Sequence, residues 1–271
     1  MDRKYYSYPE ERLKEGKIRT VCLSSSEEVF KAIAGEMADQ IKENNAKGEK
    51  SVFIVPVGPV GQYPYFVDKV RKENIQLKNV WFINMDEYLN DDLSYISMDD
   101  RLSFRGFMER TVYSQLPESL NIPEHQRVFP HPARPQAVHD LIEELGKVDI
   151  CFGGIGINGH LAFNEAEEVS AAEFADRETR IIEISRETRV TNAIGDLNGA
   201  IDAMPRYAVT VGMREILSAR KIRLGVFRPW HRAVIRQALF DDPSGHFPVT
   251  LVQNHPDSLI YVNDIAAKAA F

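Results

Sequence analysis

The chain has 271 residues, with 33 Lys and Arg against 40 Asp and Glu, so its formal net charge at pH 7 is −7. Its 44% hydrophobic and 27% charged residues are ordinary for a globular protein. The acidic balance argues against nucleic acid as a partner, because nucleic-acid binding needs a basic patch or stripe. No apolar stretch approaches the length of a membrane span or a signal peptide, so we expect a cytoplasmic protein with no membrane partner. Two cysteines, Cys22 and Cys151, lie among apolar residues, and we expect both to fill the core.

The chain beyond residue 20 alternates short apolar runs with amphipathic stretches. We expect strands near residues 51–56, 80–83, 148–152, 179–184, 207–211, 222–227 and 258–262. We expect helices near residues 25–48, 65–72, 101–116, 135–145, 214–219 and 230–240. This alternation predicts one α/β domain, residues 25–271, with a mostly parallel sheet and helices on both faces, after an N-terminal extension of residues 1–24. Periodicity fades between residues 185 and 205, which predicts either a mobile lid or an ordinary surface excursion.

Polar residues replace apolar ones abruptly at the ends of two predicted strands. The first such end is the sequence Asn84-Met85-Asp86-Glu87-Tyr88, and the second is the glycine cluster that runs from Gly153 to His160. Ligands of open α/β sheets bind at the carboxyl ends of the strands. We therefore expect the functional site where these two segments meet.

The glycine cluster literally matches the nucleotide motif G-x-G-x-x-G at Gly154, Gly156 and Gly159. A nucleotide site should continue into a helix of small residues and a second strand that ends in an acidic residue. Here the glycines lead to His160 and Glu165 instead, so a nucleotide cofactor is disfavoured.

Two pairs of ionisable residues at these strand ends suit proton transfer. An imidazole with a nearby carboxylate, His160 with Glu165, can transfer protons near neutral pH. A loop histidine with a solvated glutamate is an equally good interpretation of this pair alone. Asp86 and Glu87 could face the same crevice, although an isolated Asp-Glu pair is more often a helix cap or a solvated turn.

The two strand-end motifs, taken together, resemble the glucosamine-6-phosphate deaminase (isomerase) family. Further similar segments follow in the same order at residues 188–192, 205–212 and 254–256. The resemblance implies a NagB-like fold with Rossmann-like topology, related to that of 6-phosphogluconolactonases. It also implies a reaction in which an amino sugar phosphate yields a ketose phosphate and ammonia.

The resemblance assigns roles to four residues. Asp86 matches the carboxylate that shuttles a proton at sugar carbon 2, His160 matches the imidazole that assists ring opening, and Glu165 matches a carboxylate that supports this imidazole. Asn158 stands where the family has an aspartate, so a neutral amide replaces a charge next to the histidine. No Cys or His cluster has zinc-ligand spacing, so we expect no metal and no cofactor.

Phosphate recognition departs from the family pattern. The phosphate loop is Val57-Gly58-Pro59-Val60-Gly61, which lacks two hydroxyls and one backbone N–H of the family loop. A phosphate-gripping arginine of the family aligns with Ile194, and its lysine aligns with Arg232. The candidate substrate-binding residues are Gly58, Val60, Gly61, Glu87, Gly154, Gly156, Gly159, Arg228 and Arg232.

The sequence thus predicts an enzyme that acts without a metal on a hexosamine phosphate or a related sugar. Two alternatives remain open at this point: a sugar lactonase, or a sugar-binding or regulatory protein with reduced catalysis. The expected partner is a small-molecule sugar phosphate or related sugar, and the resemblance also allows a homo-oligomer.

Overall fold

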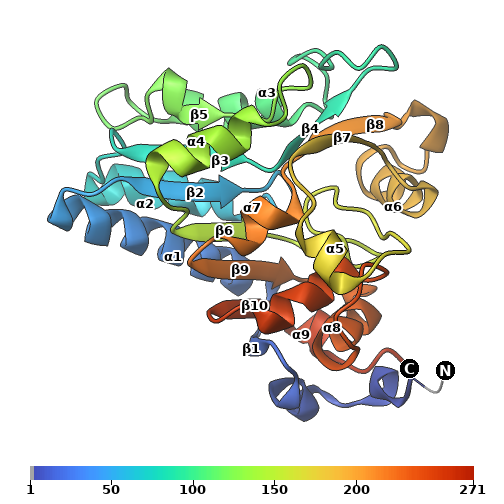
Figure 1. The fold of residues 1–271 in the computed structure, drawn as a ribbon. Coiled ribbons are helices and arrows are strands. Elements are labelled where there is room, and N and C mark those ends of the chain that lie inside the picture. The colour runs from blue at the N-terminus through green and yellow to red at the C-terminus, as the bar shows by residue number, and fades with distance from the viewer. Residues whose placement is uncertain (1–2) are drawn as a thin grey trace.

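The computed structural model of the protein describes residues 3–271 and is built around a seven-stranded sheet (Figure 1). Across this sheet the strands follow the order β1 (Arg19–Leu23), β10 (Ser258–Asn263), β9 (Lys221–Val226), β6 (Ile150–Gly153), β2 (Ser51–Val55), β3 (Val80–Asn84) and β5 (Arg127–Val128). Every neighbouring pair is parallel. The predicted mostly parallel α/β sheet is therefore confirmed.

Helices cover both faces of this sheet, and the middle strand β2 is apolar on both sides. Phe53 and Val55 pack under α1 (Ser26–Lys47), α2 (Gln62–Glu73) and α3 (Phe104–Thr111). Val52 and Ile54 point to the other face, which is covered by α4 (Ala137–Leu145), α7 (Met213–Leu217), α8 (His231–Phe240) and α9 (Asp264–Ala267). A fully buried parallel sheet needs apolar residues at consecutive positions, and all five residues of β2 are buried.

A second, antiparallel sheet extends beyond the carboxyl ends of the main sheet. It has the order β4 (Asp86–Leu89), β8 (Tyr207–Thr210) and β7 (Arg180–Glu183). Only Met85 separates β3 from β4, so the chain passes directly from one sheet to the other. Figure 1 shows this small sheet and α6 (Arg186–Asp196) at the end of the molecule towards which β2 and β9 point. The sequence analysis did not predict this second sheet.

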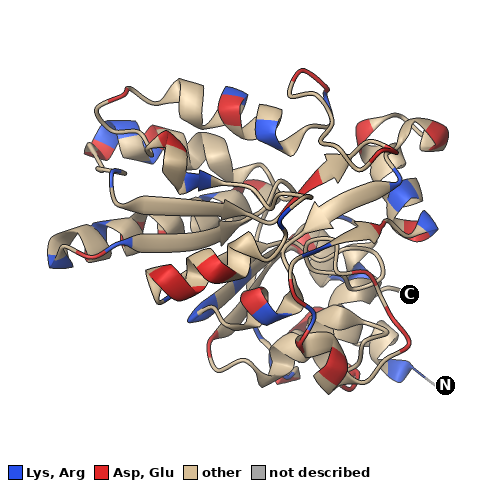
Figure 2. Ribbon diagram, turned by 45° about the horizontal axis from the view of Figure 1, so that its top comes forward, with Lys and Arg blue, Asp and Glu red and all other residues tan. Residues whose placement is uncertain are grey.

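The remaining elements are short. They comprise α5 (Ala171–Ala175) and the 3₁₀ turns Lys4–Ser7, Glu10–Glu15, Tyr113–Gln115, Glu124–Gln126, Ile201–Ala203 and Pro248–Asn254. Within residues 3–271, no helix combines the length and apolar character that crossing a bilayer requires. In Figure 2 the strands of the main sheet are mostly uncharged, and acidic and basic residues mix on the surrounding helices and loops.

Several sequence-based expectations about the elements were wrong. No boundary falls at residue 24, because β1 pairs with β10 at the sheet edge and Leu13 and Ile18 lie in the main core. Cys22 is exposed on this edge strand, whereas Cys151 is buried as expected. The helix expected over 101–116 is ordered as α-helix only at Phe104–Thr111.

The segment 185–205, expected to be irregular, begins with the helix α6. The Ser185 side chain accepts a hydrogen bond from the N–H of Thr188 and caps this helix. Thr188 and Ala193 are its buried residues, so its apolar stripe is too narrow to produce a helical periodicity in the sequence.

Candidate active site

A cleft of about 550 Å³ lies at the carboxyl ends of the parallel strands. The loops that follow β2, β6 and β9 all contribute to its lining, and α6 and the start of α3 complete it. Strands β2 and β6 are adjacent in the sheet. After β2 the chain continues to β3 on one side of this pair, and after β6 its next strand in this sheet is β9 on the other side. Such a switch point is where ligands bind in open α/β sheets.

Glycine is required at two points of the loop after β6. A Cβ at Gly156 would lie 2.0 Å from Cε1 of His160, so the imidazole ring packs directly on this glycine. A Cβ at Gly154 would lie 3.0 Å from the carbonyl oxygen of Gly58, so the loops after β2 and β6 touch. Both glycines line the cleft, whereas Gly159 does not. Gly159 has φ of 80° and packs on Phe247, so it shapes the turn before His160.

His160 is held by Asn158 in a single tautomer. Nδ1 of His160 lies 2.7 Å from Oδ1 of Asn158, and Nδ2 of Asn158 donates to Oε2 of Glu165 at 2.6 Å. An amide oxygen only accepts hydrogen bonds, so Nδ1 of His160 carries the proton. Nε2 therefore keeps its lone pair, and His160 lines the cleft. The amide of Asn158 thus lies between the imidazole and the carboxylate that the sequence paired directly.

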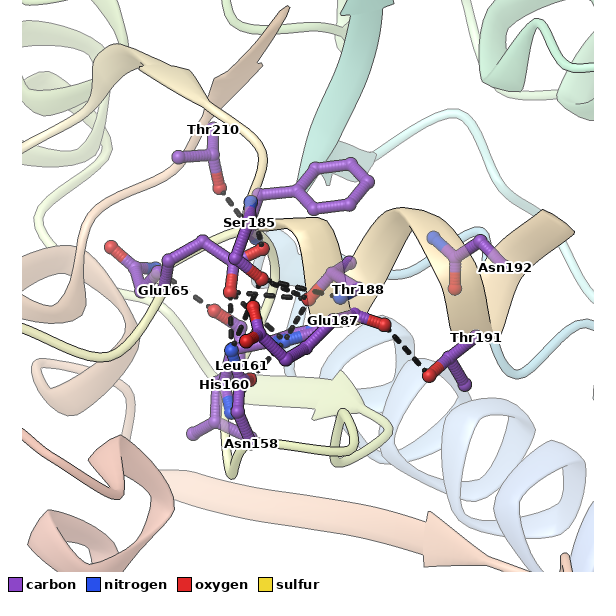
Figure 3. A network of polar contacts seen from close by, with 12 residues as sticks. Asn158, His160, Leu161, Glu165, Ser185, Glu187, Thr188, Thr191, Asn192 and Thr210 are labelled. Atoms are coloured by element: carbon purple, nitrogen blue, oxygen red, sulfur yellow. Dashed lines mark hydrogen bonds and ion pairs between the residues drawn. The ribbon is translucent and has the colours of Figure 1, made fainter. Parts of the chain in front are cut away.

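The first turn of α6 completes this network (Figure 3). The hydroxyl of Thr188 donates to Oε2 of Glu165 at 3.1 Å and lies 3.3 Å from Nδ1 of His160. The backbone N–H of Ser185 donates to Oε1 of Glu165 at 3.3 Å, and the hydroxyl of Ser185 donates to that of Thr188. Glu165 is therefore held behind the imidazole and does not line the cleft.

Burial governs the protonation of His160. It lowers the pKa of His160 below the ordinary value, and the charge of Glu165, whose Oε2 lies 3.7 Å from Nδ1, opposes this effect. The imidazole is therefore neutral at neutral pH. A neutral imidazole with a free Nε2 can accept a proton from a ligand in the cleft.

Asp86 is the other ionisable group that the sequence placed here. It is the first residue of β4, its exposed fraction is 7%, and it lines the cleft. Burial and the neighbouring Glu87 raise the pKa of Asp86 well above its ordinary value. No hydrogen-bond donor within residues 3–271 lowers this pKa. A carboxyl group without such a donor is able to take up and return a proton.

Glu87, which the sequence analysis placed among the substrate-binding residues, does not line the cleft. Its side chain is fully buried and accepts hydrogen bonds from the backbone N–H groups of Phe104 and Arg105 and from the hydroxyl of Ser103. Its Oε2 also lies 3.2 Å from Nε of Arg105. Glu87 points away from the cleft because successive residues of a strand face opposite sides. It anchors the first turn of α3.

The expected phosphate-binding residues divide into two groups. Gly58, Val60, Gly61 and Arg228 line the cleft. Arg232 does not line the cleft, and its Nε donates to the carbonyl oxygen of Ile265.

The structure also places residues in the cleft that the sequence analysis did not select. They include Arg101, which precedes α3, and Asp196, which ends α6. The sequence analysis noted residues 188–192 only because they resemble a segment of the deaminase family. In the structure, the hydroxyl of Thr188 contacts both His160 and Glu165. Within residues 3–271 no cluster of three or more His, Cys, Asp or Glu side chains is arranged to hold a metal ion.

A buried carboxyl group and a neutral imidazole that share one cleft at a strand-switch point define an α/β enzyme that moves protons on a small ligand. Comparison with known proteins finds similar chains along more than nine tenths of the sequence. Over 258 residues the chain is 27% identical to a glucosamine-6-phosphate deaminase of Aliivibrio salmonicida, covering 93% of this chain and 92% of the relative. Identity to a glucosamine-6-phosphate deaminase of Clostridium perfringens is 27% over 259 residues, covering 93% and 99% of the two chains. No family model matches the chain.

Solved structures agree with these relatives. A monomeric glucosamine-6-phosphate deaminase superposes with a TM-score of 0.79 at 26% identity, covering 92% of this chain and 99% of the other. A 6-phosphogluconolactonase from Shewanella baltica has a TM-score of 0.65 at 17% identity, covering 91% and 97%, which shows a shared fold. The resemblance inferred from the motifs is confirmed: the chain is a full-length relative of the glucosamine-6-phosphate deaminases and has their NagB-like fold.

Proposed function

We propose that the protein deaminates and isomerises a hexosamine phosphate, giving a ketose phosphate and ammonia. The observation that carries this proposal is that the buried carboxyl group of Asp86 and the imidazole of His160 line the same cleft. The full-length relatives named as glucosamine-6-phosphate deaminases support the choice of substrate class.

His160 opens the sugar ring in this proposal. Its free Nε2 accepts the proton of the anomeric hydroxyl while the ring oxygen gains a proton, so the cyclic form becomes the open-chain aldehyde. Asn158 supports this step because it holds the proton on Nδ1. Glu165 stabilises the imidazolium that forms, acting across the 3.7 Å that separates it from the ring.

Asp86 then moves a proton between carbons. Its carboxylate removes the proton from carbon 2 of the open-chain aldehyde, and the same proton, or one from solvent, is delivered to carbon 1. A proton passes from the amino group to the carbonyl oxygen of carbon 1, which becomes a hydroxyl. The product is an imine at carbon 2. Water adds to this imine, and ammonia leaves with formation of the ketone. A raised carboxyl pKa favours a residue that must both accept and donate a proton.

The experiment is a coupled assay of ammonia release with glucosamine 6-phosphate, run on the wild type, on Asp86→Asn and on Asp91→Asn. Asp91 is an exposed residue of the loop after β4 and serves as the matched control. We expect ammonia from the wild type and the control, and a loss of about 10²–10⁴ in rate for Asp86→Asn. Equal rates in all three proteins would contradict the role of Asp86.

A second arm of this assay separates the alternatives. Hydrolysis of 6-phosphogluconolactone without ammonia release would indicate a lactonase, and binding of sugars without turnover of either substrate would indicate a binding or regulatory protein. Assembly as a homo-oligomer and a cytoplasmic location remain separate proposals.

A further inference from the structure

The end of the cleft next to the loop 57–61 is apolar. The ring of Phe30 packs on this loop, since a Cβ at Gly61 would lie 2.4 Å from the ring. Phe227 meets Phe30 edge to face with ring centroids 4.9 Å apart. Pro59 has no N–H to donate, and the side chains of Val57 and Val60 are aliphatic and offer no hydrogen-bond donor.

The polar groups of α8 near this end are already committed. Nδ1 of His231 accepts hydrogen bonds from the N–H groups of Phe227 and Arg228, so Nε2 carries the proton and donates to the carbonyl oxygen of Ile155. His231 is uncharged, because burial lowers its pKa to about 3. Arg232 bonds to Ile265 outside the cleft. A dianion at this end would lose its hydration without gaining a cation.

Two arginines lie instead at the exposed side of the cleft. Arg101 comes from the loop before α3 and Arg228 from the loop after β9; both line the cleft and both are exposed. The guanidinium of Arg228 lies against the last turn of α6, since a Cβ at Gly195 would be 3.2 Å from its Nη1. The hydrogen bonds of Arg228 within the described chain are made by its backbone, so its guanidinium remains available to a ligand.

Asp196 lines the same cleft as Arg101 and Arg228, and it follows Gly195, against which the guanidinium of Arg228 lies. Burial raises the pKa of Asp196, and the charges of Arg228 and Arg101 oppose this rise. Both guanidinium groups are therefore close enough to Asp196 to interact with its charge. An anion that binds between the two arginines is attracted by both guanidinium groups and repelled by the carboxylate of Asp196.

We propose that the acidic group of the ligand binds between Arg101 and Arg228, beside Asp196, and that an uncharged part of the ligand faces the loop 57–61. A guanidinium group presents a planar fork of donors that fits the oxygens of a phosphate or a carboxylate. The ligand class is therefore an amino sugar that carries a phosphate or a carboxylate. This inference deepens the proposed function. It rests on that function for the statement that the ligand is an amino sugar, whereas the anion site is argued from the cleft alone.

Asp196 gives the inference a distinctive signature. Its negative charge opposes an incoming anion, so removing that charge strengthens anion binding, whereas removing either arginine weakens it. A site at the loop 57–61 and Arg232 would respond to none of these three changes.

The experiment measures the Kd of glucosamine 6-phosphate, 2-amino-2-deoxyglucuronic acid, glucosamine and inorganic phosphate by calorimetric titration. The variants are Arg101→Gln, Arg228→Gln and Asp196→Asn, with Arg232→Gln as the matched arginine control. We expect each cleft arginine variant to weaken binding of the sugar acids about 10–100-fold, as for a lost hydrogen bond to a charged group. We expect Asp196→Asn to tighten it about fivefold and Arg232→Gln to leave it unchanged.

The outcomes separate this inference from the proposed function. Unchanged affinities in Arg101→Gln and Arg228→Gln, or weakening confined to Arg232→Gln, overturn the anion site even if ammonia is released. The expected pattern of affinities without ammonia release upholds the anion site and contradicts the deaminase. Comparing glucosamine 6-phosphate with the aminouronic acid identifies phosphate or carboxylate as the preferred anion. Equal binding of glucosamine, which carries neither anion, overturns the need for an anionic group.

Discussion

Replacing Gly156 by alanine tests how strictly the loop after β6 positions His160. The new Cβ would lie 2.0 Å from Cε1 of the imidazole, and ordinary van der Waals contact begins at 3.4 Å, so the ring must shift by about 1.4 Å. Gly156 does not have a positive φ, so alanine adds no backbone strain there. A displacement of about 1 Å at a reacting group costs about 10²-fold in rate, and we expect this loss in kcat with a folded protein.

The assay compares kcat for ammonia release in Gly156→Ala with that in Gly35→Ala. Gly35 lies within α1, and a Cβ added there would meet nothing within 4 Å, so alanine at this position keeps activity and stabilises the helix by about 1 kcal/mol. Chemical denaturation and the NMR titration of His160 accompany the kinetics. If Gly156→Ala keeps wild-type kcat and an unshifted His160 resonance, the inferred packing of the imidazole on this glycine is refuted.

Three further predictions concern buried polar groups. Glu87→Gln should lower the free energy of unfolding by about 3–5 kcal/mol, because Arg105 and the first turn of α3 lose a buried charged partner; urea denaturation measures this, and a change below 1 kcal/mol, roughly the value of a surface pair, would contradict it. Asn158→Asp should raise the pKa of His160 and move the acid limb of the kcat/KM profile to higher pH by about 1–3 units, because an anion replaces the amide at Nδ1; overlaying profiles would show that residue 158 does not tune the imidazole. His231 is neutral in the fold, with a pKa of about 3 against 6.5 for the ordinary imidazole, so its contribution is complete well above pH 6.5 and falls by about 2 kcal/mol between pH 6.5 and 4.5. His231→Asn should lose that much less stability over the same range, and parallel denaturation curves would contradict the assignment.

The position of the cleft could be predicted from the sequence because it depends on strand order. Apolar runs that end abruptly in polar residues mark the carboxyl ends of parallel strands, and Asp86 and His160 stand at two such ends. The loop glycines next to His160 indicated a close backbone approach, which the packing of the imidazole on Gly156 explains. These features are local in the sequence, so one chain suffices to infer them.

The sequence did not reveal which side of an element faces the cleft. Glu87 follows Asp86 directly, but alternation along β4 turns it towards α3. Arg232 and His231 are neighbours, yet the start of α8 turns only His231 towards the cleft. Arg101 and Asp196 belong to no motif, and only the tertiary structure brings them to one side of the cleft. Polar helices with a narrow buried stripe, such as α6, leave no periodic signal.

The central claim is that Asp86 transfers a proton at carbon 2 of an amino sugar, and isotope exchange tests it most directly. Glucosamine 6-phosphate is incubated in deuterium oxide with the wild type and with Asp86→Asn, and deuterium at carbons 1 and 2 of the recovered sugars is measured by NMR. The account predicts deuterium incorporation with the wild type and a loss of about 10²–10⁴ in its rate with Asp86→Asn. Incorporation at the same rate in the folded variant would contradict the claim.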